Sequence, residues 1–385
     1  MKHKILIGFL FLLSVPIASA QLYTITDLGQ LSPTAINIWD QVVGNFNGHA
    51  FLWERGQGMR DLGLLPGGTS SYAISISDLG VVTGTADGAG TVISPESSFP
   101  NQECSDLTQP FVWTPQKGMQ GLGTIGVPPV ETMFPFWCEI PFYGTGVNVF
   151  GQVIGYTTLY SDNYQWGFLW TSGEVMTLFG SSFPPTMANG ISDPGQIVGQ
   201  TGILIGVATS WKGGVATDLV TLGGAALDYS SSANGVNDWG QIVGWSTTVS
   251  LDPDCGFNLV GCPMHAVLWT RNGEINDLGT LPGDSLSAAS NINFFGQVIG
   301  SSGNTLDELG WGGTGGSGFD GEGGAVAVIG HPFIWSAPKG MEDLNARIRA
   351  GSGWVLNSVS GINFWGQIVG SGTFNGQSHG FLLTP

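Results

Sequence analysis

A nine-residue pattern that occurs seven times constrains the fold of this chain more than any other feature. It reads aliphatic residue, Asn or Ser, two variable residues, Gly, Gln, two aliphatic residues and Gly. Its copies span Ile36–Gly44, Ile76–Gly84, Val147–Gly155, Ile191–Gly199, Val236–Gly244, Ile292–Gly300 and Ile362–Gly370. Asp40 replaces the first glycine once, and Val81 replaces the glutamine once. Because two apolar runs flank a glycine turn, each copy predicts a β-hairpin.

A second pattern, which resembles HAFLW, follows each hairpin. Its copies begin at His49, Gln109, Trp166, Val207, His265, His331 and His379. Six of them are followed by a glycine turn and a strand that resembles MRDLG (59–63), whereas the seventh copy runs out at Pro385. Each complete repeat therefore predicts two hairpins in series, or four strands.

The strand that the last repeat lacks occurs at the other end of the sequence. The segment YTITDLG (23–29) matches the MRDLG strand and precedes the first repeat without a hairpin of its own. An open array would leave both ends unpaired, but a circular one lets this segment pair with residues 379–384. The sequence thus predicts an all-β fold: a seven-bladed β-propeller of four-stranded blades, closed by the N-terminal strand pairing with the last blade.

The first twenty residues have the features of a cleavable signal peptide. Lys2 and Lys4 precede an apolar run at 5–17, and Ala18–Ala20 offers small residues for cleavage. A membrane anchor is the alternative, but the run is shorter than the roughly 20 residues that a spanning helix needs. We therefore expect a signal peptide at 1–20 and a single propeller domain at 21–385. The expected location is secreted, extracellular or periplasmic, without a membrane span after cleavage.

These repeats resemble the family of extracellular repeat proteins named for the HAF repeat, after His49-Ala50-Phe51. The resemblance covers essentially all of 21–385 and rests on the combined INxxGQVVG, HAFLW and DLGTLPGG patterns. The fourth repeat departs from it, since VATSW (207–211) lacks the His and Phe, and the second repeat is stretched. The resemblance implies secretion and repetition, and it carries no activity.

Composition narrows the possible partners. The chain has 63 glycines, 20 prolines, 42% hydrophobic residues and 10% charged residues, a balance that excludes a helical protein and a disordered one. Without Lys2 and Lys4 it has 8 basic residues against 28 acidic ones, a net charge of −20. A nucleic acid or an anionic membrane surface is therefore an unfavourable partner. The acidity suits solubility outside the cell, or else a divalent cation or a cationic ligand.

The histidines argue against a specialised catalytic site. Those beyond the signal segment, His49, His265, His331 and His379, all occupy the same position of the repeat. None is left over to act as a general base, and no nucleophile elbow, phosphate loop or metalloprotease motif occurs. We predict no catalytic residue, although an enzyme that uses carboxylates remains an alternative.

Two sets of aromatic residues recur. Tryptophans of the HAFLW pattern (53, 113, 170, 211, 269 and 335) are expected to pack between adjacent blades. The second set lies in the turn of the first hairpin, just before its glycine, where side chains are usually exposed. We take five of these as candidate ligand-binding residues: Trp39, Phe150, Trp239, Phe295 and Trp365.

Length variation is confined to one face of the predicted disc. The longer connections are 85–108, 124–144, 245–264, 301–330 and 346–358. Because they join second to third strands or successive blades, all emerge on the face opposite the short turns. Function on a repeat scaffold often resides in such loops.

The four cysteines also lie in these insertions. An even number of cysteines in an exported chain favours disulfides. We expect Cys255 to pair with Cys262 and Cys104 with Cys138. We expect no cofactor or metal. The segment FDGEGG, with Asp320 and Glu322, is a weak candidate for Ca²⁺, since it lacks the ligand spacing of an EF-hand.

Three functions remain open from the sequence. The first is a secreted, monomeric binding module whose ligand is an extracellular polysaccharide or protein, held on the insertion face. The second is an extracellular polymer-degrading enzyme with paired carboxylates on that face, and the third is a structural envelope or matrix component.

Overall fold

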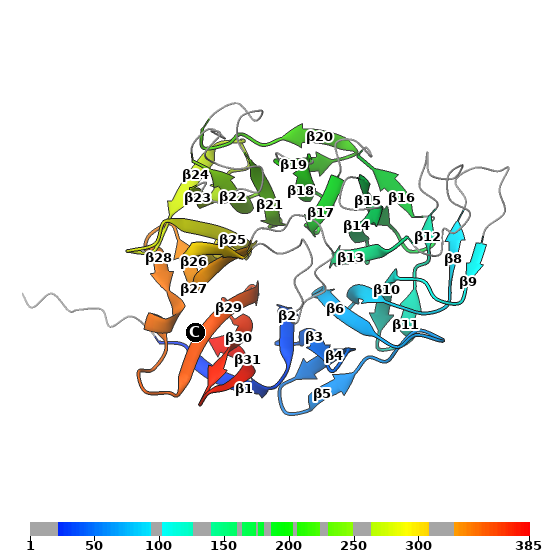
Figure 1. The fold of residues 1–385 in the computed structure, drawn as a ribbon, viewed down its shortest axis with the longest axis horizontal. Helices are drawn as coiled ribbons and strands as arrows, with labels where there is room; N and C mark the ends of the chain where they lie inside the picture. Colours follow the sequence, from blue (N-terminus) through cyan, green and yellow to red (C-terminus); the bar gives the residue numbers. More distant parts are fainter. Residues whose placement is uncertain are drawn as a thin grey trace, which may run out of the picture.

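The computed structural model describes residues 22–93, 102–125, 140–159, 164–174, 176–180, 186–202, 206–223, 230–248, 263–307 and 327–385. Within these residues the strands form seven four-stranded sheets and one three-stranded sheet, and Leu344–Arg347 forms the 3-10 helix η4. The four-stranded sheets are arranged around a common centre, as in a β-propeller (Figure 1).

The four-stranded sheets follow the chain, and each is antiparallel. Sheet 1 contains β2 (Ser32–Ile36), β3 (Val42–Phe46), β4 (His49–Glu54) and β5 (Gly58–Asp61). Sheet 2 contains β6 (Ser71–Ile76), β7 (Val82–Ala86), β10 (Gln109–Thr114) and β11 (Gly118–Gly121). Sheet 3 contains β13 (Phe142–Val147), β14 (Val153–Leu159), β15 (Tyr164–Trp170) and β16 (Thr177–Phe179). Sheet 4 contains β17 (Thr186–Ile191), β18 (Ile197–Thr201), β19 (Val207–Lys212) and β20 (Val215–Asp218).

The remaining three repeat this arrangement. Sheet 5 contains β21 (Ser231–Val236), β22 (Ile242–Thr247), β23 (Met264–Trp269) and β24 (Ile275–Gly279). Sheet 6 contains β25 (Leu286–Ile292), β26 (Val298–Asp307), β27 (Ala327–Ser336) and β28 (Gly340–Asp343). Sheet 7 contains β29 (Trp354–Ile362), β30 (Ile368–Phe374), β31 (Gln377–Thr384) and, from the other end of the chain, β1 (Thr24–Gly29).

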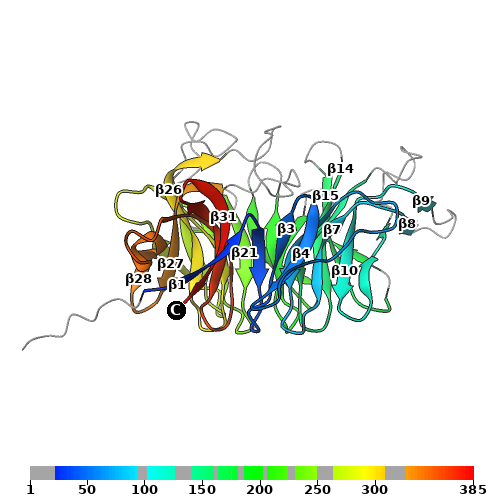
Figure 2. The same cartoon turned by 90° about the horizontal axis from the view of Figure 1, so that it is seen from below.

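The predicted closure of the ring is confirmed. β1 pairs antiparallel with β31 from Thr24 opposite Thr384 to Gly29 opposite Gly380. The first strands of successive four-stranded sheets contact one another in chain order, and β29 returns to β2. Figure 2 shows β1 lying beside β31 at the side of the disc.

The predicted count of sheets is wrong by one. An eighth sheet consists of β8 (Gly90–Ile93), β9 (Gln102–Cys104) and β12 (Thr124–Ile125), with β8 in the middle. These strands come from segments that were expected to be loops, and they lie at the outer rim beside sheet 2 (Figure 1). We call them the rim sheet. The repeat pattern could not reveal it, because its strands have no counterpart in the other repeats.

Other insertions are also shorter than predicted, because their ends continue as regular structure. β26 and β27 extend into the 301–330 connection and pair as far as Asp307 opposite Ala327. The 124–144 connection contains β12 and the start of β13, and the 346–358 connection contains part of η4 and the start of β29. Among the described residues, no helix is long and apolar enough to cross a membrane.

The last glycine of the nine-residue pattern is required by close packing within each sheet. A Cβ atom on Gly155 would lie 1.8 Å from the Tyr143 carbonyl oxygen and 2.6 Å from the Phe168 ring. Phe168 faces Gly155 across the β14–β15 pair and is fully buried. In all seven copies the atom nearest to such a Cβ is a carbonyl oxygen of the first strand, which explains why the glycine recurs.

The hydrophobic core is divided among the interfaces between neighbouring sheets. One cluster joins Val43 and Leu52 of sheet 1 to Ala73 and Phe111 of sheet 2, and similar clusters lie at the other junctions. The expected packing role of the recurring tryptophans is clearest for Trp269, which is fully buried and whose indole nitrogen donates to the Val220 carbonyl.

Candidate functional site

Each turn between the first two strands of a sheet is organised by its Asn or Ser. In sheet 1 the Asn37 side-chain oxygen accepts hydrogen bonds from the backbone nitrogens of Trp39 and Gln41, at 3.0 and 3.1 Å. Its amide nitrogen donates to the Gln41 side chain at 2.7 Å and to the Ser77 carbonyl of sheet 2 at 3.2 Å. The turn is thus fixed internally and tied to the next sheet.

The glycine of this turn has a positive φ, as the sequence predicts. The angles lie between 72° and 81° for the six turn glycines, and Asp40 takes the same conformation with φ of 61°. Glycine adopts this region without steric cost. The turn conformation projects the preceding residue outward.

The five candidate ligand-binding residues are all exposed at this turn position. The exposed fractions are 68% for Trp39, 73% for Phe150, 54% for Trp239, 64% for Phe295 and 62% for Trp365. Leu79 occupies the equivalent place in sheet 2 and is 73% exposed. Because equivalent turns of a ring lie on one face, six large apolar side chains share that face.

Aromatic rings connect part of this face across three sheets. The Trp239 and Phe294 ring centroids are 5.1 Å apart, those of Phe294 and Phe364 are 5.2 Å apart, and those of Phe295 and Phe364 are 4.7 Å apart. Phe364 also lies 4.9 Å from the Trp365 ring. We define the turn surface by the following residues: Trp39, Leu79, Phe150, Trp239, Phe294, Phe295, Phe364 and Trp365.

Two tryptophans of the turn surface also brace the ring. The Trp39 indole nitrogen donates to the Asp78 carbonyl at 2.9 Å, and that of Trp365 donates to the Ile38 carbonyl at 3.0 Å. These bonds hold each indole across the neighbouring turn while leaving most of its surface exposed. Trp39 and Trp365 therefore combine a structural role with an accessible face.

Three carboxylates occupy the turn position that Phe294 and Phe364 fill elsewhere. Asp78, Asp193 and Asp238 come from sheets 2, 4 and 5. Burial raises the pKa of Asp78, against a hydrogen bond from the Ile38 nitrogen, and the charge of Asp238 raises it further. Burial likewise raises the pKa of Asp193, and a hydrogen bond from the Val149 nitrogen partly opposes this rise. Repulsion from the charges of Asp238 and Asp78 raises the pKa of Asp193 further. The three carboxylates thus form one mutually repelling group.

Replacing Asp238 by Asn is expected to lower the pKa of both Asp78 and Asp193, because it removes a charge that repels them. Asp238→Asn keeps the side-chain oxygen that accepts from the Asp193 nitrogen at 2.9 Å. Carboxyl NMR titration measures the change. Asp87 is the control: burial opposes its ionisation, yet bonds from Thr69 and Ser70 keep its pKa below the usual range, and this value should not move.

The same substitution should affect stability in a defined direction. A carboxylate whose pKa is raised on folding destabilises the folded state above that pKa, and the penalty disappears as the pH falls through it. Asp238→Asn should therefore raise the unfolding free energy at pH 7 by about 0.2–0.5 kcal/mol after solvent screening. The gain should vanish in acid, and a gain that persists below pH 3 would contradict the repulsion.

The four histidines have structural partners. His49, His265 and His379 lie 2.8–2.9 Å from Asp61, Asp277 and Asp27 on the fourth strand of the same sheet. Each of these aspartates also accepts from the glycine nitrogen two residues later, at 2.8 Å. The fourth histidine, His331, lies 3.6 Å from Asp284. The His of HAF and the Asp of DLG are therefore partners in one recurring contact.

Several predicted features lie outside the described residues. Among them are Cys138, Cys255, Cys262, Asp320 and Glu322, together with most of the 245–264 and 301–330 connections. Cys104 ends β9 and is disulfide-bonded, and its pairing with Cys138 stays a prediction. Within the described ranges no group of three or more His, Cys, Asp or Glu residues is placed to hold a metal ion.

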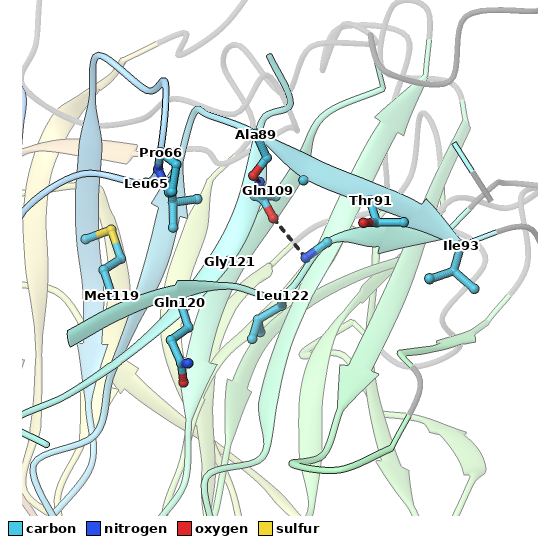
Figure 3. A pocket seen from close by; sticks show the side chains of 12 residues that line it. Leu65, Pro66, Ala89, Thr91, Ile93, Gln109, Met119, Gln120, Gly121 and Leu122 are labelled. Atoms are coloured by element: carbon cyan, nitrogen blue, oxygen red, sulfur yellow. Dashed lines mark hydrogen bonds between the residues drawn. The ribbon is translucent and has the colours of Figure 1, made fainter. Parts of the chain in front are cut away.

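A cavity of about 420 Å³ lies at the outer edge of sheet 2, away from the turn surface (Figure 3). β8 and β11 form two of its sides, and the loop at Leu65 and Pro66 forms another. The Gln109 side chain lies within it and accepts a hydrogen bond from the Gly123 nitrogen at 2.9 Å. Sequence reasoning did not identify this cavity.

Sequence reasoning also missed five residues of the central turns. Phe294, Phe364, Asp78, Asp193 and Asp238 all follow the Asn or Ser of the nine-residue pattern directly. This position alternates between Phe, Asp, Ile and Val, and that variation was the available signal. The position after it carries aromatic residues in five of the seven repeats, so its signal in the sequence is stronger.

Comparison with solved structures shows a likeness of fold alone. A catalytically inactive virginiamycin B lyase from Staphylococcus aureus, in complex with quinupristin, has a TM-score of 0.50 and 11% identity, covering 94% of this chain and 100% of that one. A streptogramin B lyase has a TM-score of 0.49 and 11% identity, and the match covers 95% of this chain and 99% of that one. The extracellular domain of a one-component system of B. thetaiotaomicron has a TM-score of 0.43 and 8% identity, and the match covers 95% of this chain and 40% of that one. No known family and no curated protein matches the sequence.

Proposed function

We propose that this protein is a binding module that recognises another protein through the turn surface. The observation that carries the proposal is the gathering of six exposed large apolar side chains on one face of the ring. Scattered exposed apolar residues are ordinary, but a contiguous patch rimmed by polar groups is typical of interaction sites. Tryptophan and phenylalanine are enriched in the cores of such interfaces.

The arrangement of the rings favours a protein over a polysaccharide. The interplanar angles are 54° for Trp239 and Phe294, 59° for Phe295 and Phe364, and 77° for Phe364 and Trp365. Sugar rings stack on flat aromatic faces, and these tilted neighbours offer no common plane. Interlocking apolar side chains of a protein partner fit such a surface better.

The charges indicate what the partner presents. The three aspartates lie among the inner turns, and exposed cations lie on the outer turns that join third and fourth strands: Arg55, Lys117, Lys212, Arg271 and Lys339. A partner with a Lys or Arg side chain surrounded by apolar groups would match the centre of this pattern. A second copy of the same face would instead bring carboxylates against carboxylates, so we favour a different protein as the partner.

We further propose that the partner is met outside the cytoplasm. The support is the signal-like segment at 1–20 and the HAF-type repeats, both of which are properties of the sequence. The even number of cysteines and the scarcity of basic residues are both consistent with export. The insertion face, the site first predicted from the sequence, falls largely outside the described residues, and its role in binding stays a prediction.

A displayed library of random twelve-residue peptides should yield ligands that combine Lys or Arg with aromatic or aliphatic residues. The selected peptides are synthesised, and their affinities are measured by calorimetry. Phe295→Ala and Trp239→Ala should each weaken binding by at least about ten-fold, as expected for interface hot spots. Asp193→Asn should weaken the Lys- or Arg-containing peptides and leave uncharged analogues unchanged.

Val355→Ala is the matched control. Val355 is 57% exposed at the start of β29, at the end of the strand opposite the turn. If it weakens binding as much as Phe295→Ala, or if selection yields no basic and apolar peptides, the turn surface is not a protein-binding site. A glycan array run in parallel tests the alternative, and glycan binding that Phe295→Ala abolishes would replace a protein partner with a polysaccharide.

A further inference from the structure

The cavity beside sheet 2 lies where this sheet departs from the repeat at two positions. In sheets 1, 5 and 7 a histidine begins the HAF segment and contacts an aspartate on the fourth strand. Sheet 2 has Gln109 and Gly121 at these two positions. The first difference places an amide where the other sheets have a histidine, and the second removes the carboxylate side chain. The Gln109 amide occupies the space beside Gly121, and β8 of the rim sheet forms one side of the cavity.

Gln109 joins the two sheets at this point. It is only 1% exposed, its amide nitrogen donates to the Ala89 carbonyl at 3.1 Å, and its oxygen accepts from Gly123 at 2.9 Å. A Cβ atom on Gly121 would lie 2.4 Å from this oxygen, and one on Gly90 would lie 2.4 Å from the amide nitrogen. The glycines therefore allow a buried amide at the base of the cavity. Figure 3 shows Gln109 between Ala89 and Leu122.

Among the described residues that line the cavity none is charged, although the chain contains 28 acidic residues. Its apolar walls include Leu65, Pro66, Met119 and Leu122, and its polar side chains are amides and a hydroxyl. β11 is the outermost strand of sheet 2, so one edge of its backbone has no neighbouring strand among the described residues. A charged ligand would lose hydration here without gaining an opposite charge. An amide group could pair with the free strand edge.

We propose that this cavity binds an uncharged molecule that combines an apolar body with an amide group. Its volume of about 420 Å³ lies within the range of small-molecule sites in proteins. Capped apolar amino acids have this chemistry, and so do uncharged segments of extended peptides. The site is separate from the turn surface, and it does not depend on the function proposed for that surface.

Three small probes that differ mainly in charge test the proposal. N-acetyl-L-phenylalaninamide is neutral, N-acetyl-L-phenylalanine carries a carboxylate, and L-phenylalaninamide carries an ammonium group. By ligand-observed NMR the neutral probe should bind with a dissociation constant of about 1 mM. The two charged probes should bind at least about ten-fold more weakly. Equal binding of all three would overturn the proposal, as would binding of none.

A double substitution that restores the repeat residues locates the site. Gln109→His with Gly121→Asp introduces the pair found in sheets 1, 5 and 7 and should abolish binding of the neutral probe. Unchanged binding would place the probe elsewhere and overturn the assignment. Amide shift mapping on the unsubstituted protein is independent of whether this variant folds. The largest shifts should occur at Thr91, Gly121 and Gly123, and shifts confined to the turn surface would contradict the proposal.

Discussion

Deleting residues 22–29 is expected to destabilise the protein by more than about 4 kcal/mol and to leave an aggregation-prone chain. The deletion removes β1, whose pairing with β31 completes sheet 7. It uncovers an edge next to Phe381, Leu382 and Leu383, which are fully buried. It also removes the hydrogen bond from the Tyr23 nitrogen to the Arg347 carbonyl, which holds the chain against sheet 6.

Thermal and urea unfolding, followed by circular dichroism, measure this loss. The matched control is a permuted chain in which residues 22–29 follow Pro385 through a three-residue turn like that at 55–57. This chain keeps every strand and changes only the connection, so it should unfold close to the unaltered protein. If the deletion variant unfolds at the same denaturant concentration as the permuted chain, closure contributes little to stability.

The repeat pattern could predict the ring because each of its residues has one structural task in every copy. Gly155 faces Phe168 across a strand pair, and Asn37 fixes its own turn. Such contacts are local, so they recur at fixed spacing and can be read from the sequence. The closing strand was predictable for the same reason. The last repeat has His379 but no DLG strand after it, and Asp27 of the N-terminal DLG supplies the missing partner.

Features that depend on contacts between repeats were harder to predict. The first strand of each four-stranded sheet has a register shift near its middle, as between Pro33 and Ala35. The residue at this bulge reaches the neighbouring sheet: Thr34 donates to the Ala73 carbonyl, and Asn234 donates to the Ala289 carbonyl. These positions vary among Thr, Ile, Asn and Ser, so their shared role is visible only when neighbouring sheets are placed side by side.

The candidate site was predicted only in part, for a related reason. Exposed aromatic residues at the turns followed from the position of Trp39 and its equivalents, and the structure places all five candidates on one face. That Phe294 and Phe364 join them into a continuous surface depends on ring contacts across sheets. The rim sheet and the cavity beside it arise where the repeat is interrupted, and a repeat pattern contains no information about its own interruptions.

Replacing Asn363 by Ala is expected to destabilise the protein by about 3 kcal/mol, because one buried side chain satisfies four polar groups. Asn363 is 4% exposed. Its oxygen accepts from the nitrogens of Trp365 and Gln367, at 3.1 and 3.0 Å. Its amide nitrogen donates to the Gln367 side chain at 2.6 Å and to the Asn37 carbonyl at 3.0 Å. The last bond joins sheet 7 to sheet 1, so the substitution weakens the junction that completes the ring.

The control for this substitution is Asn357→Ala on β29, the strand that ends just before Asn363. Asn357 is exposed and donates one hydrogen bond of 3.2 Å to the Thr373 hydroxyl, so its loss should cost less than about 0.5 kcal/mol. Urea unfolding of both variants measures the difference. Because Asn363 also holds the turn that presents Trp365, Asn363→Ala should reduce peptide binding at the turn surface, whereas Asn357→Ala should not. Equal unfolding free energies for the two variants would show that the turn is fixed by its backbone alone.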